Sequence, residues 1–195
     1  MQAVTTMIYK QLFGSVCALG TLALLGSICS VAQAQSAKPK FAYGKKSDRQ
    51  LAKELWKALR SNRMVGRERI NVHAFEGKRP HGAVQQIYTA TIKVKGRQGR
   101  AIVKANHTKK GVTVQNVYDS PNKYLSGYTV MFANKPGYDP ENNDWFWVHY
   151  RTDGRVNQAA NGLAVAGRVG KLSDYGCISC HRKIGGDDLE ALTSK

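Results

Sequence analysis

Two cysteines and a histidine lie close together near the carboxyl end, in the sequence Cys177-Ile178-Ser179-Cys180-His181. The spacing of the two thiols suits the two vinyl groups of one porphyrin. The histidine follows at once, so it can give its imidazole to the iron from the same turn. The pattern therefore predicts that Cys177 and Cys180 attach one haem c covalently and that His181 is an axial ligand of its iron.

The cysteine pair has three other possible interpretations. A small disulfide between Cys177 and Cys180 is chemically reasonable in an exported protein. Half of a zinc site would need further cysteines or a paired histidine nearby in the sequence, and none is present. A thioredoxin-like redox pair would need a βαβ setting, which the pattern of this chain lacks. Haem attachment is favoured because three scarce residue types coincide.

The amino-terminal segment has the features of a secretory signal. Lys10 is its one charged side chain, an apolar run follows from Leu12 to Val31, and Ala32-Gln33-Ala34 matches a small-x-small cleavage site. We expect residues 1–34 to be removed on export to the periplasm. Retention as a membrane anchor is the alternative, since the run approaches the length that spans a bilayer. Residues 35–46 have no hydrophobic period and are predicted to be a flexible lead-in.

The chain is strongly basic, with a formal net charge of +17. Such a charge favours an acidic redox partner or an anionic membrane surface. Nucleic acid is not expected as a partner, because the chain is exported and its basic residues are scattered. We expect a soluble, acidic cytochrome to be the redox partner.

The remaining residues, 47–195, are predicted to form a single haem-binding domain. A capping box at Ser47–Gln50 predicts a helix whose apolar face carries Leu51, Leu55, Trp56 and Leu59. Five segments rich in β-branched and aromatic residues predict strands joined by short turns, which suits antiparallel pairing. They cover residues 83–94, 100–106, 112–118, 128–133 and 145–150.

The last part of the chain is predicted to turn and then deliver the cysteine motif. Asp153-Gly154 predicts a turn that leads back to Arg155-Val156. Residues 161–176 are expected to be a short glycine-rich connection or helix. The predicted fold class is therefore α+β, an antiparallel sheet with flanking helices and a C-terminal haem c attachment segment.

The position of the motif limits the sixth iron ligand. Only a short tail without methionine follows His181, so a ligand for the other side of the haem must come from upstream. Met64 and Met131 are the only methionines left after removal of the signal. The alternative is an open sixth position, which would allow the iron to bind or turn over a small molecule.

Several short segments together resemble the cytochrome P-460 family and the related cytochrome c′-β proteins. The resemblance covers the chain from about His81 to His181. It implies an α+β fold dominated by an antiparallel sheet, usually in a homodimer, with the haem edge-on to the sheet and held by the C-terminal motif. The matching segments are Pro80-His81-Gly82, Ala101-Ile102-Val103-Lys104, Tyr128-Thr129-Val130-Met131, Pro136-Gly137-Tyr138-Asp139-Pro140, Asn143-Asp144-Trp145-Phe146-Trp147 and the Cys-x-x-Cys-His motif.

The resemblance also implies roles for particular residues. Catalytic members of the family join a strand lysine covalently to the porphyrin, and Lys104 matches that lysine by motif. An additional bond would distort and retune the macrocycle. From strand alternation alone, Lys104 would instead be an ordinary exposed lysine.

The region above the iron departs from the family pattern. The hydroxylamine-oxidising members place an acidic side chain there, whereas this chain has Met131 and Phe132. The departure counts against hydroxylamine oxidation, and an apolar cover by either residue would favour a pocket for NO or CO. The expected activity is thus oxidation of hydroxylamine or nitric oxide, or non-catalytic gas binding or electron transfer of the c′-β type. His81 is expected in a turn, and His149 on the outward side of its strand.

Overall fold

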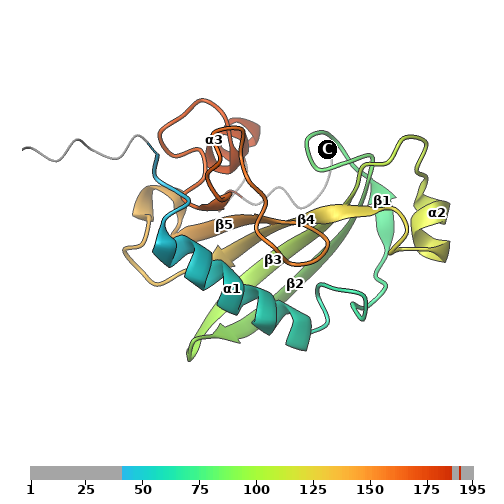
Figure 1. The fold of residues 1–195 in the computed structure, drawn as a ribbon, viewed down its shortest axis with the longest axis horizontal. Coiled ribbons are helices and arrows are strands. Elements are labelled where there is room, and N and C mark those ends of the chain that lie inside the picture. The colour runs from blue at the N-terminus through green and yellow to red at the C-terminus, as the bar shows by residue number, and fades with distance from the viewer. Residues whose placement is uncertain (1–40, 186–188, 190–195) are drawn as a thin grey trace, which may run out of the picture. The chain divides into compact units, whose positions relative to one another are not determined.

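The structure is a computed structural model that describes residues 41–185 and residue 189. The predicted signal peptide, 1–34, and most of the predicted lead-in lie outside the described residues. Figure 1 shows the elements in chain order. They are α1 (Lys46–Ser61), β1 (Ala74–Glu76), β2 (Val84–Val94), β3 (Arg97–His107), α2 (Val114–Asp119), β4 (Leu125–Ala133), the 3-10 helix η1 (Pro140–Asn142), β5 (Trp145–Tyr150), β6 (Ala166–Gly167) and α3 (Cys177–Ile184).

The six strands form one antiparallel sheet in the order β1-β2-β3-β4-β5-β6, so each strand pairs with its neighbours in sequence. The α+β class and the antiparallel sheet with flanking helices are confirmed. Among the described residues, no helix is both long and apolar enough to cross a membrane. Four of the five predicted strands coincide with β2, β3, β4 and β5, within a few residues at their ends.

The predicted strand 112–118 is wrong, because most of this segment forms α2. Thr113 is the N-cap of that helix, and its hydroxyl accepts a hydrogen bond from the backbone N–H of Asn116 at 3.1 Å. The Asn116 side chain accepts in turn from the backbone N–H of Thr113 at 3.2 Å. This reciprocal capping outweighs the β-propensity of the valines that flank it.

The first helix forms as predicted, but its N-cap is Lys45, two positions earlier than the expected Ser47. The helix begins at Lys46, and the backbone N–H of Lys45 donates to the carboxylate of Asp48 at 3.0 Å. The short carboxylate of Asp48 thus takes the role that the sequence analysis gave to Gln50. Before the helix, Gly44 already donates to the carbonyl of Ala166 at 2.8 Å, so the chain is tied to the sheet from there.

One face of the sheet is covered by α1, which lies across the strands in Figure 1. Leu55 and Leu59 of α1 are fully buried and pack in one cluster with side chains of β3, β4 and β5. The hydroxyl of Tyr150 donates to the carbonyl of Ala52 at 2.6 Å and ties the helix to β5. This face holds the main hydrophobic core, which positions the strands.

The other face of the sheet carries α3 (Figure 1). Ile178 of α3 is fully buried in a second cluster with Ile102, Met131 and Trp147, which come from β3, β4 and β5. Because side chains alternate along a strand, these three residues point away from α1. The Cys-x-x-Cys-His sequence therefore lies over the face of the sheet opposite the main core.

Candidate haem site

The motif forms the first turns of α3, and Cys177, Cys180 and His181 line one cavity of about 930 Å³. Residues three and four positions apart lie on the same face of a helix, so the helical conformation itself brings the two thiols and the imidazole together. Ile178 points to the other side and anchors the helix in the apolar cluster. The helix thus presents all three groups to the cavity in a fixed relation.

A close contact between two glycines sets where α3 begins. Gly176 has a φ of +118°, and a Cβ added to it would lie 2.9 Å from the Cα of Gly170. Only glycine accepts both that conformation and that contact. The backbone N–H of Ile178 then donates to the carbonyl of Val169 at 2.9 Å. The segment at Val169 and Gly170 is therefore held against the first residues of α3.

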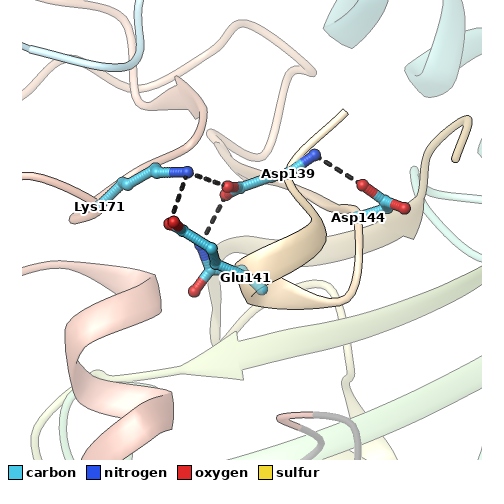
Figure 2. A network of polar contacts seen from close by, with 5 residues as sticks. Asp139, Glu141, Asp144 and Lys171 are labelled. Carbon is cyan, nitrogen blue, oxygen red and sulfur yellow. Dashed lines mark hydrogen bonds and ion pairs between the residues drawn. The ribbon is translucent and has the colours of Figure 1, made fainter. Parts of the chain in front are cut away.

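A polar network holds the segment that leads into α3 (Figure 2). Lys171 forms ion pairs with Asp139 and with Glu141, the latter at 3.0 Å. The backbone N–H of Asp139 donates to Asp144 at 2.6 Å, and the Asp139 carboxylate is fully buried. The hydrogen bond from Lys171 to Asp139 raises the pKa of Lys171. Asp139 and Glu141 thus anchor the segment that leads to the cysteine motif.

His181 is oriented by a backbone acceptor. Its Nδ1 lies 2.6 Å from the carbonyl oxygen of Leu189, which can only accept, so Nδ1 carries the proton. The Nε2 atom is then left with a free lone pair, as iron ligation requires. The ring packs edge-on against Trp147, with 4.7 Å between the ring centres. Burial lowers the pKa of His181, which keeps the imidazole neutral.

Both cysteines of the motif are free thiols in the structure. Burial raises the pKa of the Cys177 thiol to about 12, which disfavours the thiolate that a redox pair or a zinc site needs. Among residues 41–185 and 189, no group of three or more His, Cys, Asp or Glu side chains is placed to hold a metal ion. The raised pKa of Cys177 therefore counts against a zinc site or a redox pair at these cysteines.

Lys104 lies on the cavity wall and is only 8% exposed. It pairs with Ile87 of β2 on one side and Thr129 of β4 on the other. Burial lowers the pKa of Lys104, whereas the nearby Cys180 raises it. The interpretation of Lys104 as an exposed strand lysine is therefore wrong, and its amine faces the same cavity as the cysteine motif.

Met131 and Phe132 point to opposite faces of the sheet. Met131 lines the cavity but packs in the apolar cluster with Ile178, beside the attachment helix. Phe132 is fully buried in the main core on the α1 face, so it does not reach the cavity. Strand alternation separates the two neighbours, so of the two residues expected as a possible cover only Met131 lines the cavity, and the assignment of Phe132 to the pocket is wrong.

A polar wall, which was not predicted from the sequence, continues this face of the sheet beside the apolar cluster. Four cavity-lining residues make it: His81, Asn106, Thr129 and His149. Thr129 Oγ1 lies 3.0 Å from Nδ1 of His81 and accepts a hydrogen bond from Asn106 at 3.3 Å. His149 Nδ1 lies 3.3 Å from the side-chain nitrogen of Asn157. Of these four residues only Asn106 is buried, and a group of polar side chains on the cavity wall suits a polar ligand.

The expected position is confirmed for one of the two histidines of the polar wall and wrong for the other. His81 lies in a turn, as predicted, and its backbone N–H donates to the carbonyl of Lys78 at 3.1 Å. His149 was expected to face outward, yet it has the same parity along β5 as Trp147, and this parity could have predicted its direction. His81 lies outside any helix or strand, so no periodicity applies to it. Burial, with the nearby Lys104 and His181, lowers the pKa of His81 to about 3. Burial also lowers the pKa of His149.

Two buried polar atoms on the cavity wall test whether a haem suits this site. Trp147 Nε1 and Asn106 Oδ1 have no hydrogen-bond partner among the described residues. A buried polar atom usually has one. A carboxylate of a haem could accept from Trp147, whereas Asn106 needs a donor, which a haem does not carry and a second bound molecule could supply. The volume of about 930 Å³ lies at the upper end of the range for cofactor pockets, about 300–1,000 Å³. The residues present fit a haem.

No known protein family matches the chain, and no curated protein or solved structure is similar to it. The resemblance to the cytochrome P-460 family therefore stays a prediction that rests on the segments named above.

Proposed function

We propose that this chain is an exported mono-haem c-type cytochrome that oxidises a small nitrogen species, hydroxylamine or nitric oxide, and passes the electrons to a soluble acceptor. The observation that carries the proposal is the cavity shared by Cys177, Cys180, His181 and Lys104. Lys104 comes from a part of the chain far from the other three residues, and the chemistry of the four matches what the resemblance implies. The cleaved signal, the periplasmic location and the homodimer belong to the same proposal.

The residues of the cavity would each have a distinct role in binding the haem. Cys177 and Cys180 would form the two thioether bonds, and His181 would bind the iron through Nε2. When bound, haem supplies an iron that binds a small molecule and exchanges single electrons with it. Lys104 brings a buried amine to the same cavity, where it would tune the haem electrostatically whether or not it forms the covalent bond that the family implies.

The polar wall would orient the small molecule. Asn106 has an unpartnered buried carbonyl oxygen, which can accept a hydrogen bond from an N–H or O–H group. Hydroxylamine carries both kinds of donor, whereas nitric oxide carries neither. The wall therefore favours hydroxylamine over nitric oxide, although it lacks the carboxylate found in hydroxylamine-oxidising members of the family.

A second candidate is a non-catalytic cytochrome that carries electrons or binds NO or CO. The position of His81 favours it, because the ring centre of His81 lies 6.1 Å from that of His181 in the same cavity. A second imidazole so close to the first would restrict access to an iron.

The test uses the precursor co-expressed with a c-type haem maturation system. We expect a red, haem-containing mature protein that oxidises hydroxylamine or nitric oxide with an artificial electron acceptor. His181→Ala should abolish the activity, whereas Arg182→Ala should leave it unchanged, because Arg182 is exposed on the same helix. Turnover no faster than that of free haem would exclude the catalytic proposal in favour of the second candidate.

Peptide mapping by mass spectrometry decides the bonding of Lys104. A tryptic peptide containing Lys104 that travels with the haem peptide of Cys177 and Cys180 would establish a covalent bond. Separate peptides would leave Lys104 in the cavity as a non-covalent neighbour of the haem.

A further inference from the structure

His81 and His181 face each other across the candidate haem cavity. Their ring centres are 6.1 Å apart, and their planes make an angle of 84°. Both side chains line the cavity, and both interact electrostatically with Lys104 on its wall. The two imidazoles come from opposite ends of the sheet domain in sequence, so their proximity is a property of the fold.

The distance between the rings matches that of two imidazoles bound to one metal ion on opposite sides. Each metal–nitrogen bond is about 2.0–2.1 Å, and each ring centre lies roughly 1 Å beyond its nitrogen, so the ring centres should be about 6 Å apart. The angle between the planes is free, because each ring can rotate about its own metal–nitrogen bond. Two protein ligands suffice when a porphyrin supplies the other four nitrogens.

The hydrogen bonds of the two rings also fit this arrangement. His181 donates from Nδ1 to the carbonyl of Leu189, which leaves Nε2 for the iron. His81 is held at Nδ1 by the hydroxyl of Thr129 at 3.0 Å. A hydroxyl oxygen has two lone pairs, so Thr129 can accept from both Asn106 and His81, and Nε2 of His81 is then also free. Each ring has the support at Nδ1 that metal-bound histidines usually have.

Met131, one of the two methionines considered as the other ligand, packs with Ile178 and Trp147 in the apolar cluster. His81, by contrast, lies beside His181 in the cavity.

We propose that His81 is the second axial ligand of the haem iron in the resting protein, opposite His181. The inference rests on the proposed haem attachment and adds a control of access to the iron. A small molecule must displace His81 before it can bind, so the rate at which His81 leaves the iron limits ligand binding.

The ferric spin state of the haem-loaded mature protein tests the proposal. We expect absorption and electron paramagnetic resonance spectra of a six-coordinate, low-spin iron in the wild type. His81→Ala should become mainly high-spin, and added imidazole should restore the low-spin spectrum. In the ferrous form, His81→Ala should bind CO at least about tenfold faster than the wild type, whose rate should level off at high CO concentration.

His149→Ala is the matched control, since His149 also lines the cavity but lies on β5. It should keep the low-spin spectrum. A high-spin wild type would overturn the proposal, as would a low-spin spectrum that survives in His81→Ala. Loss of the low-spin spectrum in Lys104→Gln, with His81→Ala unchanged, would assign the ligand to Lys104 instead.

Two further measurements identify the axial ligands and separate His81 ligation from the catalytic function. If His81→Ala does not fold, near-infrared magnetic circular dichroism of the wild type still separates bis-histidine ligation from histidine–lysine or histidine–methionine ligation. Only the first result supports the proposal. A low-spin protein without turnover of hydroxylamine or nitric oxide would support His81 ligation and refute the catalytic function, whereas a high-spin protein with turnover would do the reverse.

Discussion

The two faces of the same sheet are built for different purposes. On the α1 face, the side chains of the strands meet Leu55 and Leu59 and close into an apolar core. On the α3 face, the same strands present Lys104, Asn106 and Thr129 to a cavity of about 930 Å³. Alternation along the strands lets one set of backbone hydrogen bonds support both surfaces. The first face holds the main hydrophobic core, whereas the second leaves buried polar atoms of Asn106 and Trp147 without partners among the described residues.

The largest expected effect is on the α3 face and concerns haem retention. In Cys177→Ala/Cys180→Ala, both thioether bonds are lost, so we expect no haem to remain with the denatured protein on a haem-stained gel or in its intact mass. The far-UV circular dichroism should stay close to that of the wild type, because the α1 core does not involve the motif. Ser179→Ala, within the same turn, should retain its haem.

A loss of secondary structure in the double variant would contradict the separate roles of the α1 face and the α3 face. It would mean that the haem, and not the α1 core, holds the sheet together.

The matching change on the α1 face is Leu55→Ala. It removes a fully buried side chain from the main core and should lower the free energy of unfolding by about 2–5 kcal/mol. Denaturant titration measures this loss, with exposed Lys53→Ala as the control on the same helix. The protein that remains folded should carry its full content of haem, since Leu55 does not line the cavity. Loss of haem without loss of stability would show that the two faces are not separable.

The next effect concerns the ion pairs of Lys171 with Asp139 and Glu141, which hold the segment that leads into α3. Lys171→Met leaves the buried carboxylate of Asp139 without its cation and should cost about 1–3 kcal/mol in the free energy of unfolding. The pKa of Lys171 is raised above its ordinary value of 10.5, so its contribution is complete below pH 10.5 and is lost as the pH rises further. The difference between wild type and variant should therefore shrink in strongly alkaline buffer.

Chemical denaturation at two pH values measures this difference. Glu141→Gln is the control, because Glu141 is largely exposed and its ion pair with Lys171 should contribute little. A difference that stays constant with pH would show that Lys171 acts through packing and not through its charge.

The sequence predicted the α1 face better than the α3 face, for a physical reason. The helical spacing of Leu55 and Leu59 predicts that both are buried, and the segments rich in β-branched residues predict strands. Both predictions are confirmed, apart from the segment 112–118. The cavity wall joins residues that are far apart in sequence, and only the strand register brings Lys104 beside Thr129. Parity along β5 could have placed His149 on this wall, but nothing local in the sequence positions His81.

Capping chemistry explains the local errors in the prediction. The segment 112–118 looked like a strand because of its β-branched residues, and the pair Thr113 and Asn116 made it a helix instead. Single hydrogen bonds of this kind outweigh weak intrinsic preferences over a few residues, whereas they do not alter the pattern of a long strand.

The smallest expected effect sharpens the role of the polar wall. Thr129→Val keeps the shape of the side chain but removes the hydroxyl that contacts His81 at 3.0 Å. Without this support at Nδ1, His81 should leave the iron more easily, so CO should bind to the ferrous protein about 2–10-fold faster while the ferric iron stays mainly low-spin. Flash photolysis or stopped-flow mixing with CO measures the rate. The stability of the α1 core should not change, because Thr129 faces away from it; an unchanged CO rate would mean that the hydroxyl does not position His81.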